Sequence, residues 1–158
     1  MSGSNLSGNQ KRRMKSASRL YAVQALFQME ASQLPIDVVS KEFEEQRMGA
    51  ELDGAQLEDG DIAHFNRVIA GAVNNQARID QMTDRALVAK WPIARLDPTL
   101  RALFRAAGAE FVEGDTPPKV AIVEYVDVAL AFSPDGKERG FVNAVLDHMA
   151  REARPEDF

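Results

Sequence analysis

Residues 119–132, KVAIVEYVDVALAF, decide whether this chain is all-helical or contains a buried strand. Five of these residues are β-branched and would suit the core of a sheet: Val120, Ile122, Val123, Val126 and Val128. An apolar stretch of about 14 residues without a turn is nevertheless longer than the usual 4–8 residues of a strand. Glu124 and Asp127 also keep one edge of a helix polar. We therefore predict a helix over this segment.

The sequence on either side predicts more helices. Apolar residues recur at helical spacing over about 14–31, from 35 onward, over 62–73 and 79–87, from 98 to 111, and over 141–149. The pairs Asp97-Pro98 and Thr116-Pro117 are typical helix starts. Residues 49–61 hold three glycines and five acids, which predicts a solvated connection. The expected fold is all-α, with about seven helices in two small packed bundles and no convincing strand.

The chain length fits one domain with short tails. The first ten residues are rich in Ser, Asn and Gly, so we expect a disordered tail over 1–10. The domain then covers 11–153, with a C-terminal tail over 154–158. Trp91-Pro92 interrupts the helical pattern and divides an N-terminal half, to about 90, from a C-terminal half that starts at about 91.

Composition excludes several classes of protein. The 158 residues include no cysteine, which excludes disulfides, thiolate zinc sites, iron–sulfur clusters and a cysteine nucleophile. The longest apolar run, 128–132, is far shorter than the roughly 20 residues of a membrane span. The basic N-terminus lacks the apolar stretch of a signal peptide. We expect a cytoplasmic protein that makes no membrane contact.

Catalytic and metal chemistry is not indicated either. The two histidines, His64 and His148, lie far apart in the sequence, and each is interpreted as an ordinary surface or boundary residue of a helix. Gly136-Lys137 does not complete a phosphate loop, because Glu138 follows the lysine. The sequence predicts no catalytic residue, no metal site and no cofactor.

Charge is strongly polarised along the chain. Residues 1–29 carry five cations and no acid. Because the net charge of the chain is −5, the remaining residues carry a net charge of −10. On a helix extended back to Arg12, three of these cations, Arg12, Lys15 and Arg19, fall within roughly 60° of arc. This arc adjoins the apolar residues Leu20, Val23 and Leu26, which form the core stripe of the helix. We therefore expect the helical turns that carry the cations, the basic turns, to project beyond the core. Either a polyanion binds this stripe, or it is a solvated basic end.

A second candidate site follows the turn at 133–136. Lys137, Arg139 and Phe141 combine cations and an aromatic ring beside two glycines, as single-stranded RNA sites do. Alternatively, Phe141 opens the core stripe of the last helix, since Val145 and Met149 follow it at intervals of four. Both readings stay open. We expect this turn and the basic helix to converge into one exposed shelf.

Several blocks of the sequence resemble the bacterial transcription antitermination factor NusB family. These are PPKVAIVE at 117–124, Phe132, FVNAVLD at 141–147, AVQALF at 22–27, and residues 91–96 with Arg105 and Glu110. The resemblance covers about residues 13–153. It implies two helical bundles and a non-enzymatic factor that pairs with a small ribosomal-subunit protein, NusE. The pair recognises boxA RNA in nascent transcripts, notably those of ribosomal RNA operons, within the transcription elongation complex.

The resemblance also implies which residues form the interfaces. The predicted RNA-binding residues are Arg12, Arg13, Lys15, Arg19, Lys119, Lys137, Arg139 and Phe141. Phe27 is the predicted contact with the ribosomal protein. This sequence departs from the family at the start of the first helix, where KSASR replaces a denser arginine cluster, and at Lys137, where an acid is often found. A helical protein–protein scaffold without RNA contact is the alternative, and the sequence leaves open whether the chain forms a homodimer.

Overall fold

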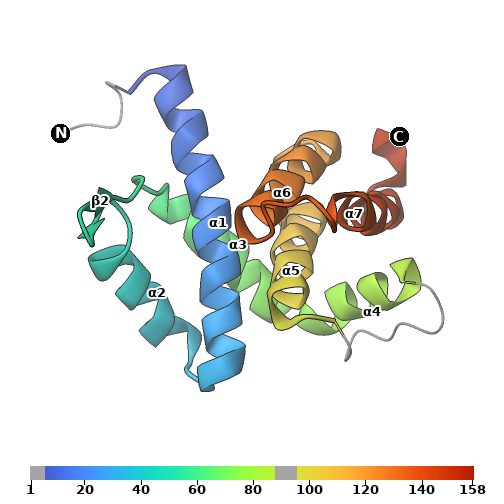
Figure 1. Cartoon of the computed structure of the whole chain (residues 1–158). Coiled ribbons are helices and arrows are strands. Elements are labelled where there is room, and N and C mark those ends of the chain that lie inside the picture. Colours follow the sequence, from blue (N-terminus) through green and yellow to red (C-terminus); the bar gives the residue numbers. More distant parts are fainter. Residues whose placement is uncertain (1–5, 88–95) are drawn as a thin grey trace.

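The computed structural model describes residues 6–87 and 96–158, and this part of the chain is predominantly helical (Figure 1). Seven α-helices occupy it: α1 (Gly8–Ser32), α2 (Ile36–Gln46), α3 (Ile62–Asn74), α4 (Gln76–Ala86), α5 (Pro98–Glu113), α6 (Pro118–Phe132) and α7 (Arg139–Ala153). A short 3₁₀ turn, Pro155–Asp157, follows. The predicted all-α class is confirmed, and residues 119–132 lie in α6 as a helix.

The helices form two groups that share one core. In the first, α1, α2 and α3 pack on one another, and in the second, α4, α5, α6 and α7 do so. Helices α1 and α3 also pack on α5, which joins the groups, and α1 crosses the front of the molecule between α2 and α6 (Figure 1). Buried residues from both groups form one hydrophobic cluster. The predicted division at Trp91-Pro92 lies outside the described residues.

Local signals explain where the helices begin. Asp97 accepts a hydrogen bond from the Thr99 N–H and precedes Pro98, the first residue of α5, as predicted. Asp61 caps α3 in the same way through the His64 N–H. The junction between α3 and α4 falls at Asn75, between the helical stretches predicted over 62–73 and 79–87.

The structure describes residues 6–10 of the first predicted tail and all of the second. Ser7 and Gln10 form a reciprocal capping box, so α1 begins at Gly8, inside the segment predicted to be disordered. At the other end Arg154 donates a hydrogen bond of 2.9 Å to the Phe111 carbonyl. The Phe158 ring lies 4.5 Å from the Arg151 guanidinium carbon. Residues 154–158 are therefore attached to α5 and α7.

The predicted solvated connection, residues 49–61, contains a small hairpin that the sequence pattern does not predict. Strands β1 (Glu51–Leu52) and β2 (Ala55–Gln56) pair antiparallel, with Glu51 opposite Gln56. Asp53 and Gly54 form the turn at φ values of 52° and 80°, the left-handed geometry of a two-residue hairpin loop. The Asp-Gly pair was the available signal, but flanking strands of two residues leave no periodicity to detect.

Candidate nucleic-acid interface

The cations of α1 do not share one surface. Arg12, Arg13 and Lys15 are exposed. Arg13 lines a hollow between α1, the hairpin and α6, which also contains Arg47 and Asp127. Lys15 lines a separate cavity between α1, α3 and α5. Two residues along a helix turn by about 200°, which explains why Arg13 and Lys15 face different sides of α1.

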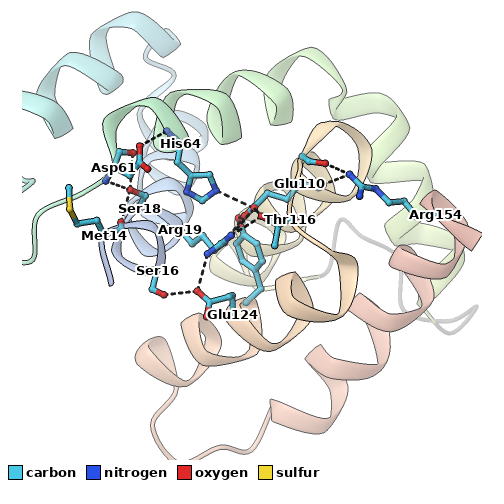
Figure 2. Close-up of polar contacts among 12 residues, drawn as sticks. Met14, Ser16, Ser18, Arg19, Asp61, His64, Glu110, Thr116, Glu124 and Arg154 are labelled. Atoms are coloured by element: carbon cyan, nitrogen blue, oxygen red, sulfur yellow. Dashed lines mark hydrogen bonds and ion pairs between the residues drawn. The ribbon is translucent and has the colours of Figure 1, made fainter. Parts of the chain in front are cut away.

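Arg19 departs from the prediction that the basic turns project beyond the core. It is only 4% exposed. Its Nε donates to Glu110 Oε2 at 2.8 Å and its Nη2 donates to Glu110 Oε1 at 3.0 Å, while its Nη1 reaches Glu124 Oε1 at 2.9 Å (Figure 2). The guanidinium lies near the core stripe because α5 and α6 supply carboxylates there. Arg19 is a buried structural residue, and an RNA contact is not assigned to it.

Glu110 is the centre of a buried polar network. Besides Arg19, it accepts hydrogen bonds from His64 Nε2 at 3.2 Å, Thr116 Oγ1 at 3.2 Å and the Tyr125 hydroxyl at 2.5 Å (Figure 2). Burial favours the neutral acid, but hydrogen bonds from His64 and Arg19 and the charge of Arg19 outweigh it and lower the pKa of Glu110 to about 2. One carboxylate thus links α1, α3, α5 and α6.

His64 and Glu124 also differ from their predicted surroundings. His64 is 5% exposed, so it belongs to the interior rather than to the surface. Glu124 accepts from Ser16 Oγ at 2.6 Å as well as from Arg19, which joins α6 to the basic turns of α1. The sequence contained one signal for the network: Glu110 interrupts the otherwise apolar AAGAEF segment of α5, where a lone carboxylate requires buried partners.

The Glu110 network predicts a specific loss of stability in acid. The pKa of Glu110 is lowered from its ordinary value of 4.5 to about 2, so its ionised form stabilises the fold above about pH 4.5, and this contribution disappears as the pH falls toward 2. The shift corresponds to about 3 kcal/mol at neutral pH. Urea unfolding of the wild type and of Glu110→Gln should show a difference that shrinks between pH 5 and pH 2.5. A constant difference would contradict this assignment.

At the second predicted site, the loop leads directly into α7. Arg139 is the first residue of this helix. The backbone N–H of Lys137 donates to Asp135 Oδ1 at 3.0 Å, and the Lys137 side chain is exposed. Phe141 is 37% exposed, and its ring packs edge-on against Phe104 at 6.4 Å between centroids. The two interpretations of Phe141 are therefore compatible, since one side of the ring packs inward while the rest is accessible.

The two predicted sites are connected across α6. Arg139 lines a shallow hollow with Val123, Asp127 and Asn143. Asp127 also lines the hollow of Arg13, so the surfaces meet on α6, which lies between α1 and α7 (Figure 1). We call this continuous surface, from Arg13 through Asp127 to Arg139, the α1–α6–α7 face. It joins two of the predicted cations, but Lys15 lies beyond it on the opposite side of α1.

Two other predicted residues lie apart from this face. Lys119 starts α6, at the end opposite the α7 loop, and its Nζ lies 5.7 Å from the Phe158 ring centroid. Phe27 is 39% exposed near the C-terminal end of α1, about 21 Å along the helix axis from Arg13. An RNA and a partner protein placed at these two ends of α1 would not compete for the same turns.

Two other kinds of site are absent from residues 6–87 and 96–158. These residues hold no group of three or more His, Asp or Glu side chains positioned for a metal ion. No helix among them has the length and apolarity that a membrane span requires.

Comparison with known proteins gives concordant results. The profile of the NusB family matches residues 16–151. The transcription antitermination protein NusB of Rhodopseudomonas palustris is 43% identical over 152 residues, covering 96% of this chain and 89% of the relative. NusB of Nitrobacter hamburgensis is 44% identical over 151 residues, covering 95% of this chain and 94% of the relative.

Solved structures agree with the fold. NusB from T. maritima superposes with a TM-score of 0.70 at 30% identity, covering 90% of this chain and 95% of that one. A crystal structure of antitermination factors NusB and NusE in complex with dsRNA contains a chain that matches with a TM-score of 0.71 at 22% identity, covering 89% of this chain and 98% of that one. At that identity the second match supports the fold alone.

Proposed function

The chain belongs to the NusB family, and from this membership we propose that it is a non-enzymatic transcription antitermination factor that binds boxA RNA together with NusE. The observation that carries the proposal is the family match over residues 16–151, because it includes the α6 and α7 segments that border the candidate RNA surface. The proposed setting is the nascent transcript of a ribosomal RNA operon, held in the elongation complex in the cytoplasm.

The proposed RNA surface is narrower than the sequence suggested. Arg12, Arg13 and Lys15 are exposed at the N-terminal end of α1, where they are available for phosphate contacts. Arg139 and the accessible part of Phe141 extend the surface across α6, and Phe141 offers a ring on which an unstacked base can lie. Arg19 positions α1 against Glu110 rather than touching RNA.

The proposed protein partner binds at the other end of α1. Phe27 is exposed there and is the predicted NusE contact. Because Phe27 lies at the other end of α1, NusE can bind there without covering the cations, and we expect it to supply additional RNA surface. A homodimer remains a separate proposal, to be tested by the oligomeric state in solution.

Titration of boxA RNA with and without NusE tests the proposed function. We expect weak, salt-dependent binding by the chain alone, and tighter binding with NusE that favours boxA over a scrambled RNA. Fluorescence anisotropy at two salt concentrations measures both effects. A duplex of the same sequence belongs in the titration, since the NusB–NusE complex solved elsewhere contains double-stranded RNA.

The same titration distinguishes the proposed function from the alternative of a protein–protein scaffold without RNA contact. A scaffold would bind NusE and show equal affinities for boxA and scrambled RNA in all conditions. That result would remove RNA recognition from the proposal while leaving the family membership intact.

A further inference from the structure

A cavity of about 300 Å³ lies between α1, α3 and α5, on the side of α1 away from the α1–α6–α7 face. Lys15 comes from α1, Arg67 and Asn74 come from α3, and Glu113 comes from the end of α5. Its volume is at the lower end of the range for small-ligand sites, about 300–1,000 Å³. The cavity is next to a cation of the proposed RNA surface, and that function does not use it.

Charge is distributed unevenly over this cavity. Lys15 and Arg67 are exposed, and neither makes an ion pair within the described ranges, so both are available to an external anion. The α5 side offers mainly acceptors: the Glu113 carboxylate, which accepts from Asn75 Nδ2 at 2.9 Å, and the Asp115 carboxylate. The cavity therefore suits a ligand that combines an anionic group with N–H donors.

His64 lies in the wall of the cavity, with its ring held toward Glu110. Its Nε2 faces the ionised carboxylate of Glu110 at 3.2 Å and must carry the hydrogen that this bond requires. In the neutral ring the other nitrogen, Nδ1, is then a bare acceptor, and it is a buried side-chain atom without a hydrogen-bond partner in the described part of the chain.

From this arrangement we propose that one unstacked nucleotide of the bound RNA enters the cavity. Its phosphate lies between Lys15 and Arg67, and its base presents an exocyclic amine to the carboxylates of Glu113 and Asp115. Adenine, cytosine and guanine carry such an amine. Uracil does not, and its single edge donor, N3–H, lies between two carbonyl oxygens that would also face the carboxylates. This inference rests on the proposed function and assigns base selection to a second site on the same protein.

The charges also argue against a protein side chain in the cavity. A lysine or arginine from a partner would satisfy the carboxylates, but it would share the cavity with the like charges of Lys15 and Arg67. An acidic side chain would satisfy these two cations and then meet the carboxylates of Glu113 and Asp115. A nucleotide satisfies both regions because its anionic and donor groups lie at opposite ends.

Three variants, measured as complexes with NusE, test the inference. Arg67→Ala removes a cation of the cavity, and Arg78→Ala removes an exposed cation of α4 outside it, which makes a charge-matched control. Asn74→Phe places a ring in the cavity without changing charge. We expect Asn74→Phe to weaken binding of a boxA RNA by about tenfold. Arg67→Ala should weaken binding by about fivefold, which is the effect of losing one phosphate contact at 0.1 M salt. Arg78→Ala should weaken binding by less than about twofold.

A measurement on the wild type does not depend on how the variants fold. We expect cytidine 5′-monophosphate to shift the backbone amide resonances of Gly71 and Asn74 in a nitrogen-15 spectrum, and uridine 5′-monophosphate to shift them less. Equal shifts from both nucleotides, or none, would overturn the inference. Equal losses of RNA affinity in Arg67→Ala and Arg78→Ala, or none in Asn74→Phe, would overturn it as well.

The outcomes distinguish this inference from the proposed function. If the wild type with NusE binds boxA RNA and Asn74→Phe binds it equally well, the cavity is excluded and the proposed function stands. If the wild type shows no preference for boxA, the proposed function fails, and the nucleotide site fails with it. If the variants lose affinity for NusE instead of RNA, the cavity serves the protein partner and the inference is wrong.

Discussion

Replacing Glu110 with alanine is expected to lower the free energy of unfolding by about 3–5 kcal/mol. The variant leaves the Arg19 guanidinium buried beside α5 without the carboxylate that accepts from both its Nε and its Nη2. It also removes the acceptor of His64 Nε2 and of the Tyr125 hydroxyl. For a chain of this size the midpoint of thermal unfolding should fall by about 10 °C. Urea and thermal unfolding followed by circular dichroism measure both quantities.

Two controls identify the cause of this loss. Glu113→Ala removes an exposed carboxylate from the same helix and should cost less than about 1 kcal/mol. The double variant Arg19→Met, Glu110→Leu replaces both charges with apolar groups and should recover much of the stability lost by Glu110→Ala. A Glu110→Ala variant as stable as Glu113→Ala would show that Arg19 does not depend on Glu110.

The same network has a consequence for RNA binding. Arg19 fixes α1 to α5 through Glu110 and to α6 through Glu124. These contacts hold Arg13 on the side of α1 that faces Asp127, so the spacing of the cations from α7 depends on a buried ion pair. Preorganisation of this kind reduces the free energy required to order the surface on binding.

The helices could be predicted from sequence because each carries its own signal. In α6, length and the polar positions Glu124 and Asp127 outweighed β-branched composition, and in α5 the Asp97-Pro98 pair fixed the first residue. The hairpin was missed because two-residue strands have no period. The start of α1 was missed because the capping box of Ser7 and Gln10 precedes the apolar stripe and belongs to a polar segment.

The candidate site was predictable only in part. Helical geometry correctly put Arg19 next to the core stripe, but it could not supply Glu110, which lies 91 residues away. Without that partner, projection into solvent was the only acceptable environment for the arginine. The separation of Arg13 from Lys15 followed from helical angles, whereas the packing of α3 and α6 on opposite sides of α1 required the tertiary structure.

Removing three of the four exposed cations of α1, Arg12, Arg13 and Lys15, should therefore have the largest effect on RNA affinity. The variant Arg12→Ala, Arg13→Ala, Lys15→Ala is expected to bind boxA RNA with NusE about 100-fold more weakly at 0.1 M salt, since each phosphate contact to a single strand contributes about 0.7 log unit there. The slope of log affinity against log salt should become shallower by about 2. Anisotropy titrations over a salt range of about 0.05 to 0.3 M give both values. A control with equal loss of charge is Lys41→Ala, Arg78→Ala, Arg85→Ala, whose residues are exposed on α2 and α4. If the slope of log affinity against log salt falls equally in both triple variants, RNA binding depends only on net charge. The cations of α1 would then not form a specific part of the interface.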